Sequence, residues 1–171
     1  MQIKRTDWMV VLLLAFITIK LFAEDQGKVT MDQTQLENVL RNYADSHTGG
    51  NGMLQFSYDG VDLLCISDVR ANRMRIVVPI YDYNAVTAEQ KDLMMLANFH
   101  TALDARYAVS NGILYAVFLH ELSSLSEMQI RSGVRQTATL AKTFGTSFNS
   151  GALTFGGNNE EQEHASGETA L

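Results

Sequence analysis

The chain has 171 residues, of which 46% are apolar, and a formal net charge of −6 at pH 7. This length fits a single domain with tails, and the apolar fraction is ordinary for a globular protein. The acidic balance argues against nucleic acid as the main partner, because no excess of lysine and arginine is present to neutralise phosphates.

Residues 1–23 have the layout of a secretory signal peptide. Lys4 and Arg5 form a basic start, an uncharged apolar run spans residues 9–19, and Ala23 is a small residue at the end of the segment. The apolar run is shorter than the roughly 20 residues that a transmembrane helix needs. The sequence therefore predicts an exported, periplasmic protein, whose segment 1–23 is either cleaved after Ala23 or kept as a short membrane anchor.

The next elements are a helix and a glycine-rich stretch. Thr30 and Gln33 form a capping-box pattern ahead of apolar residues at helical spacing, which predicts a helix over residues 31–44. Residues 47–52 contain three glycines. A strand rather than a helix follows them, and no Walker-type lysine is present, so we interpret this stretch as a flexible linker and not as a phosphate-binding loop.

Three strands are predicted next, over residues 54–58, 61–67 and 73–80. The first two are joined by Asp59-Gly60, a dipeptide that favours a two-residue hairpin turn because both positions need positive φ. The middle strand contains Cys65, the only cysteine of the chain. Its apolar surroundings predict a buried and inert thiol, and a single cysteine cannot form an internal disulfide.

A long helix, a hairpin and a third helix complete the pattern. Thr87 and Gln90 begin a helix over residues 88–105 that is apolar around more than half its circumference, so it is expected to pack on two sides. Asn111-Gly112 predicts a hairpin, and Ser124 with Glu127 predicts the start of a helix that ends near Gly145. Replacing Gly112 with valine is expected to lower stability, and the same change at Gly50 to do much less.

The element order is therefore α-βββ-α-ββ-α. Runs of strands between separate helices indicate an α+β two-layer sandwich with a mostly antiparallel, five-stranded sheet, formed by one domain over residues 24–157. Residues 158–171 contain four glutamates and no aromatic residue, and they are predicted to be a disordered acidic tail.

The residues that could carry chemistry form no known motif. His100 and Asp104 share a helix face, and His120 is followed by Glu121, but their spacing matches no zinc signature. No serine lies in a nucleophile elbow. We therefore interpret the histidines as structural, and the sequence predicts no catalytic residue, no cofactor, no metal site and no enzymatic activity.

The last strand is apolar on both faces, although helices can cover only one face of a sheet in a two-layer sandwich. Extra apolar surface usually marks a partner site. We expect a partner to be bound by Leu114 and Phe118 of this strand and by Met94, Met95 and Phe99 of the second helix. The opposite face of the strand carries Ile113, Tyr115, Val117 and Leu119.

The order of elements over residues 31–145 resembles the type III secretion chaperone-like fold, which is shared with bacterial YbjN-type domains. The resemblance rests on this order, on the central strand segments 63–66 and 74–79, and on residues 97–104 before the hairpin. It implies a small acidic monomer or dimer without catalytic residues that holds an extended segment of another protein.

The function expected from the sequence is thus that of a non-enzymatic exported protein that binds a segment of another protein through an apolar sheet or helix surface. The alternative is a homodimeric module of the cell envelope, whose extra apolar surface is buried between two copies of the chain and has no separate ligand.

Overall fold

The computed structural model describes residues 30–151. The predicted signal segment 1–23 and acidic tail 158–171 lie outside these residues. In chain order the described elements are α2 (Gln33–Tyr43), β1 (Ser46–Gly50), β2 (Met53–Tyr58), β3 (Val61–Asp68), β4 (Arg73–Asp82), the 3-10 turn η1 (Tyr83–Ala85), α3 (Ala88–His100), β5 (Ala105–Ser110), β6 (Ile113–Glu121) and α4 (Glu127–Lys142). Among them, no helix is long and apolar enough to cross a membrane.

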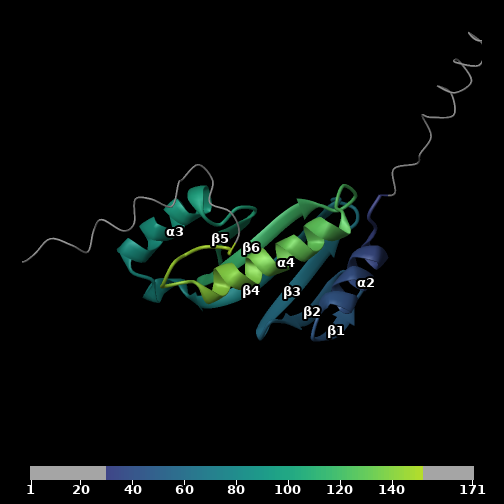
Figure 1. Cartoon of the computed structure of the whole chain (residues 1–171), viewed down its shortest axis with the longest axis horizontal. Coiled ribbons are helices and arrows are strands. Elements are labelled where there is room, and N and C mark those ends of the chain that lie inside the picture. Colours follow the sequence, from purple (N-terminus) through teal and green to yellow (C-terminus); the bar gives the residue numbers. More distant parts are fainter. Residues whose placement is uncertain (1–29, 152–171) are drawn as a thin grey trace, which may run out of the picture. The chain divides into compact units, whose positions relative to one another are not determined.

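The six strands form one antiparallel sheet in the order β1-β2-β3-β4-β6-β5. Helix α4 runs along one face of this sheet, and α2 lies beside it over β1 and β2 (Figure 1). Helix α3 packs against β5 at the other end of the sheet. The predicted α+β class and the antiparallel sheet are confirmed, with six strands in place of the five expected.

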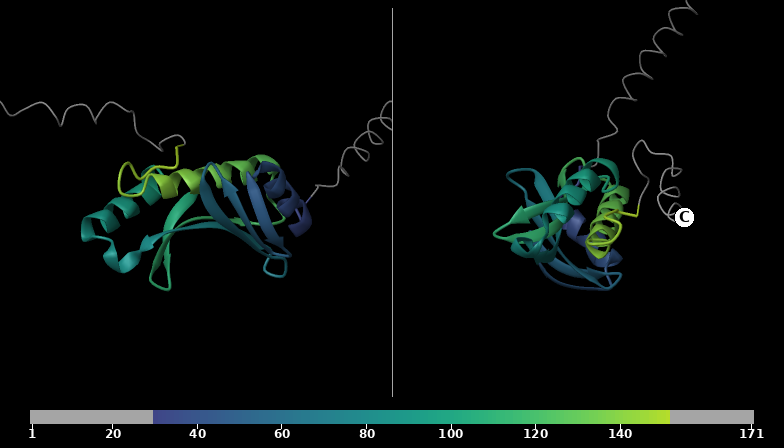
Figure 2. Two further views of the ribbon diagram at one scale, coloured as in Figure 1. Left: turned by 90° about the horizontal axis from the view of Figure 1, so that it is seen from below. Right: turned by 90° about the vertical axis from the view of Figure 1, so that its left-hand side faces the viewer.

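One face of the sheet and the inner sides of α2 and α4 form the core. Side chains alternate along a strand, so every second residue of β2, β3, β4 and β6 points toward these helices. Figure 2 shows the curved, twisted sheet with α4 on one side. The buried residues of this core include Leu36 and Leu40 of α2, Ile130, Val134 and Leu140 of α4, and Leu54, Leu63, Met74, Ile76 and Leu114 of the strands.

Both predicted hairpin turns are confirmed. Asp59 and Gly60 have φ of 52° and 72°, and Asn111 and Gly112 have φ of 50° and 77°. Positive φ at both central residues is the geometry of a type I′ turn, whose twist matches that of the flanking strands. The two dipeptides therefore set the register of β2 with β3 and of β5 with β6.

The prediction of a flexible linker over residues 47–52 is wrong, because most of this stretch belongs to strand β1. Gly50 pairs with Met53, so Asn51 and Gly52 form a third two-residue turn, with φ of 54° and 92°. The Asn-Gly signal was present in the sequence but was obscured by the two preceding glycines. This strand accounts for the difference between five and six strands.

Two of the three predicted helix starts are displaced by two residues. The capping boxes that form are Asp32 with Gln35 and Ser126 with Gln129, whereas Thr87 with Gln90 caps α3 as predicted. The displaced pairs still follow the physical rule, because each N-cap oxygen accepts from a backbone N–H three residues later. Helix α3 ends at His100 instead of residue 105, and Leu103 then takes a φ of 57° in the turn before β5.

Valine at Gly50 is now expected to destabilise the protein at least as much as valine at Gly112. A Cβ at Gly50 would lie 2.8 Å from Nη2 of Arg41, while the nearest atom to one at Gly112 is Nδ2 of Asn84 at 3.8 Å. Both positions have positive φ, and such strain costs ~1–3 kcal/mol. Chemical denaturation of the two variants measures the loss. A Gly50→Val protein as stable as the parent would contradict the observed β1–β2 hairpin.

Candidate functional site

The sheet face turned away from α2 and α4 has no covering helix in the described part of the chain. We call it the open face. The strand register places Gln55, Leu64, Val77 and Val117 in one row across it, from β2 to β6. An uncovered sheet face normally carries polar residues, but three of these four side chains are apolar. The row is flanked by Ile66, Arg75, Pro79, Tyr115 and Leu119.

A concave part of the open face forms a groove of about 710 Å³. We call it the sheet groove. Its lining comes from five of the six strands, namely β1, β2, β3, β4 and β6. The floor is apolar and consists of Leu64, Val77, Pro79, Ile113 and Tyr115. The polar rim includes Ser46, Thr48, Gln55, Ser57 and Asp62.

A β-bulge in β4 shapes one end of the sheet groove. The pairing of β4 with β6 shifts between Pro79 and Tyr81, so Ile80 is an extra residue in the ladder. A bulge of this kind bends the strand and increases its twist. Strand β3 pairs with β4 only as far as Val77, so Pro79, which has no N–H to donate, lies beyond the β3–β4 ladder.

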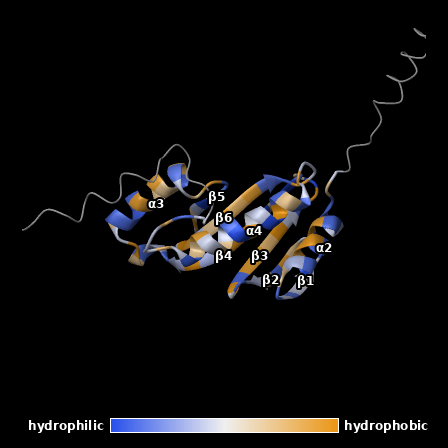
Figure 3. Cartoon of the chain, in the orientation of Figure 1, coloured by the Kyte–Doolittle hydropathy of each residue, from blue (hydrophilic) through white to orange (hydrophobic). Residues whose placement is uncertain are grey.

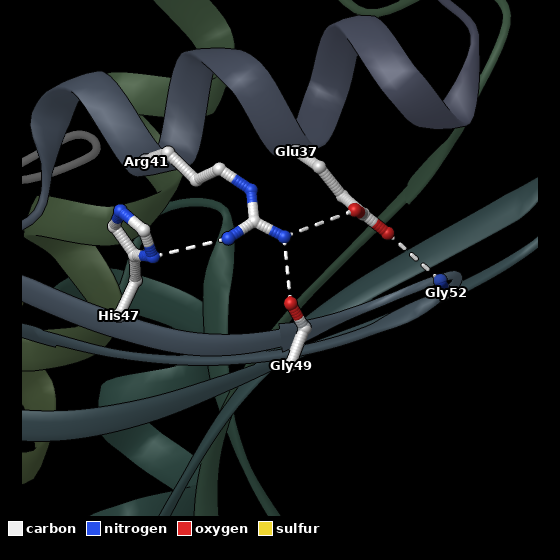
Figure 4. Close-up of polar contacts among 5 residues, drawn as sticks. All are labelled: Glu37, Arg41, His47, Gly49 and Gly52. Carbon is white, nitrogen blue, oxygen red and sulfur yellow. Dashed lines mark hydrogen bonds and ion pairs between the residues drawn. The ribbon is translucent and has the colours of Figure 1, made fainter.

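Strand β1 forms the other end of the groove, and a cluster of polar contacts with α2 holds this strand in place (Figure 4). Arg41 donates from Nη2 to the carbonyl oxygen of Gly49 at 2.7 Å and from Nη1 to Nδ1 of His47 at 3.0 Å. The backbone N–H of Gly52 donates to Oε1 of Glu37 at 2.8 Å. Glu37 and Arg41 therefore hold strand β1 and the turn that follows it against the helix.

The structure places the five predicted partner residues on two different kinds of surface. Leu114, Phe118 and Met94 are 0%, 3% and 4% exposed, so these three side chains fill the core. The expectation that they lie on a partner-binding surface is therefore corrected. Met95 and Phe99 are 69% and 79% exposed on α3, outside the lining of the groove. Their role in partner binding stays a prediction.

The reason for the correction is that α4 covers the face of β6 that carries Leu114 and Phe118. Strand β6 alternates as predicted, but a strand that is apolar on both faces does not indicate which face a helix will cover. The open face carries the other set of β6 residues instead. Figure 3 shows hydrophobic residues alternating along the strands and again along α3.

The residues considered for metal binding have structural contacts. Asp104 accepts a hydrogen bond from Nε2 of Gln136 at 3.2 Å, and Nδ1 of His120 lies 2.9 Å from the carbonyl oxygen of Glu121. The ring of His100 lies edge-on to Phe99. Within residues 30–151, no group of three or more His, Cys, Asp or Glu side chains is placed to hold a metal ion.

Cys65 is buried as predicted, with 2% of its surface exposed, and burial raises the pKa of its thiol to about 12. The thiolate is the reactive form, so at pH 8 we expect iodoacetamide to modify native Cys65 at least ~10-fold more slowly than a free thiol. Mass spectrometry of timed samples measures this rate, and denaturant should restore fast modification. Rapid labelling of the folded protein would show that β3 opens readily.

Two solved structures align with this chain. A chain from the structure of the HopA1–SchA chaperone–effector complex aligns over 65% of this chain and 90% of its own length, with a TM-score of 0.50 and 11% sequence identity. A chain from the crystal structure of the ExsC–ExsE complex aligns over 64% of this chain and 90% of its own, with a TM-score of 0.49 and 10% identity.

No family model matches the sequence, and no curated protein matches it either. At 11% identity the structural likeness concerns the fold alone. It nevertheless covers 65% of this chain. The chain therefore has the secretion-chaperone-like fold that its order of elements predicted.

Proposed function

We propose that this chain is a non-enzymatic exported protein that binds an extended segment of another protein in the sheet groove. The observation that carries the proposal is the apolar floor of the groove, which no helix covers among the described elements. Burying such a floor under a partner would be favourable by about 25 cal/mol for each Å² of apolar surface removed from water. The export signal is proposed on the sequence of residues 1–23 alone.

The lining of the groove fits a peptide better than a small polar substrate. The floor provides apolar contacts for side chains, and the rim adds hydroxyl and amide groups that can hydrogen-bond to a peptide backbone. His47 is engaged with Arg41, and Asp62 lies exposed on the rim. An extended peptide presents alternate side chains to one surface, which matches a floor bordered by polar groups.

A peptide-display screen followed by titration tests this proposal. A selected peptide should bind the full chain, and Val77→Glu should abolish binding because it places a charge on the apolar floor. Met128→Glu is the matched control, since Met128 is 77% exposed on α4, away from the groove. Equal binding by both variants would remove the groove from the proposal. Cell fractionation and N-terminal sequencing test export separately.

Self-association is the second candidate, because a second copy of the chain could cover the same apolar floor. Light scattering of the purified protein distinguishes the two. A stable dimer that Val77→Glu converts to monomer, and that selects no peptide, would favour a homodimeric module. A monomer that binds peptide would favour the segment-binding function.

A further inference from the structure

Two arginines border the apolar floor of the sheet groove on the open face. The neighbours of Arg75 along β4, Met74 and Ile76, are 1% and 0% exposed on the covered face, so Arg75 points to the open face. Arg106 of β5 pairs with Val117 of β6, and it therefore extends the central row of the open face by one strand. Both arginines are exposed. We call Arg75 and Arg106 the arginine pair.

Another arginine of β4 shows how a positive charge can be balanced on this sheet. Arg73 pairs with Asp68 of β3 on one side and with Glu121 of β6 on the other. Opposite charges directly across from each other on neighbouring strands stabilise a sheet. The charge of Arg73 is therefore balanced by residues of the sheet itself.

The arginine pair has apolar neighbours in the corresponding places. Arg75, two residues after Arg73 on the same face, pairs with Ile66 of β3 and with Leu119 of β6. Arg106 lies opposite Val117, and its Nη1 donates to the carbonyl oxygen of the preceding residue at 2.6 Å. Neither arginine has an acidic residue directly across from it.

The acidic residues of the open face do not compensate for this. Oδ1 of Asp68 accepts two backbone N–H groups of the turn that follows it, at 2.9 and 3.0 Å, and Oε1 of Glu121 accepts Nδ2 of Asn72 at 2.9 Å. Asp62 of β3 lies roughly 13 Å further along the sheet than the residue opposite Arg75. The ion pairs within residues 30–151 involve three other cations, Arg41, Arg131 and Lys142. In this part of the chain the arginine pair therefore has no counterion.

The arginine pair lies where the apolar floor ends. Val77 of the floor is two residues from Arg75 on the same face of β4, and Val117 and Leu119 of β6 lie between the two arginines. The strand spacing and the rise per residue place the Cα atoms of the pair ~12 Å apart. A segment that covers the floor and continues past Val77 thus meets a guanidinium group.

We infer that the segment bound in the sheet groove carries an aspartate or glutamate side chain next to its apolar residues, and that Arg75 and Arg106 hold this carboxylate. The inference rests on the function proposed above and adds the chemical class of the partner. A guanidinium group binds a carboxylate through two parallel hydrogen bonds, and such charge-assisted bonds are stronger than neutral ones. A lysine or arginine of the segment in the same place would be repelled.

The negative net charge of the chain does not prevent this contact. Exposed charges are largely screened from each other beyond about 8 Å at physiological ionic strength. The formal charge of −6 is summed over all 171 residues, whereas the carboxylate would lie directly against the arginine pair. The local charge of the open face therefore decides which side chain is accepted there.

Peptide selection on two proteins tests the inference. A random-peptide library is selected on the full chain and on the same chain with Arg75→Gln and Arg106→Gln. Peptides that bind the parent should be rich in Asp and Glu beside apolar residues, and those that bind the variant should not be. The selected peptides are acetylated and amidated, so that side chains supply their carboxylates. Replacing these carboxylates with amides should weaken binding to the parent about tenfold or more, and should change binding to the variant little.

The matched control carries Arg70→Gln and Arg135→Gln, which remove the same charge from the β3–β4 turn and from α4. This control should keep the preference of the parent for the carboxylate peptide. Raising sodium chloride from ~50 mM to ~500 mM should reduce that preference, because salt screens the contact. Thermal melting by circular dichroism verifies that each variant is folded.

The outcomes separate this inference from the proposed function. Equal affinity of the parent for the carboxylate and amide peptides would overturn the inference and leave segment binding in the groove intact. A preference that persists without the arginine pair, or that is lost in the control, would also overturn it. A parent protein that selects no peptide at all would overturn the proposed function, and this inference with it.

Discussion

Gln136→Leu should lower the free energy of unfolding by about 2–5 kcal/mol, although it replaces a polar side chain with an apolar one of similar size. Gln136 is 3% exposed, and its Oε1 accepts the backbone N–H groups of Asp104 at 2.9 Å and Ala105 at 3.2 Å. Leucine would leave the buried N–H of Ala105 and the part-buried N–H of Asp104 without this acceptor, and a buried unpaired group costs ~1–3 kcal/mol.

Urea denaturation of Gln136→Leu and Gln129→Leu measures this effect against a matched control on the same helix. Gln129 is exposed and takes part only in the capping box with Ser126, so its loss should cost ~1 kcal/mol. Comparable losses for the two variants would show that the link from α4 to the start of β5 does not depend on Gln136.

Gly133→Ala should lower stability by about 1–3 kcal/mol, although alanine is the better helix former by ~1 kcal/mol. A Cβ at Gly133 would lie 2.7 Å from Cδ1 and 2.8 Å from Cε1 of Phe118. Such distances require the aromatic ring or the helix to move. Gly133 therefore allows α4 to approach the sheet directly over Phe118.

A double-mutant cycle with Phe118→Leu provides the control for Gly133→Ala. Leucine removes the ring atoms that alanine would meet, so the second substitution should recover part of the loss, with a coupling of at least ~0.5 kcal/mol. Calorimetric melting of the four proteins gives the coupling. Strict additivity, or a more stable Gly133→Ala single variant, would mean that α4 and β6 are packed less closely than described.

Local sequence signals predicted most of the elements, because they act over few residues. The Asp59-Gly60 and Asn111-Gly112 turns and the Thr87 cap each depend on neighbours within three positions, and each is found. The same signal at Asn51-Gly52 was overlooked, since Gly49 and Gly50 made the stretch resemble a linker. The element order could therefore indicate the fold without any catalytic motif.

The surface could not be predicted in the same way, because it depends on which side of the sheet the helices cover. Val77 and Leu64 lie next to each other only through the pairing of β3 with β4. The role of Gln136 could not be predicted either. Its partners Asp104 and Ala105 are far away in sequence, and Gln136 accepts hydrogen bonds from their backbone N–H groups. No residue pattern along the chain signals contacts of this kind.

The ladder between β4 and β6 has a consequence for the folding kinetics of this protein. Strands β1 to β4 form a meander and β5 with β6 a hairpin, so both pieces contain only pairings between consecutive strands. The β4–β6 pairing joins them across the whole of α3 and β5, and closing such a loop carries an entropic penalty before any contact forms. We therefore expect the transition state for folding to be set by this ladder. Substitutions at Ile76 or Ala116 would then slow refolding, while changes in β1 would mainly speed unfolding.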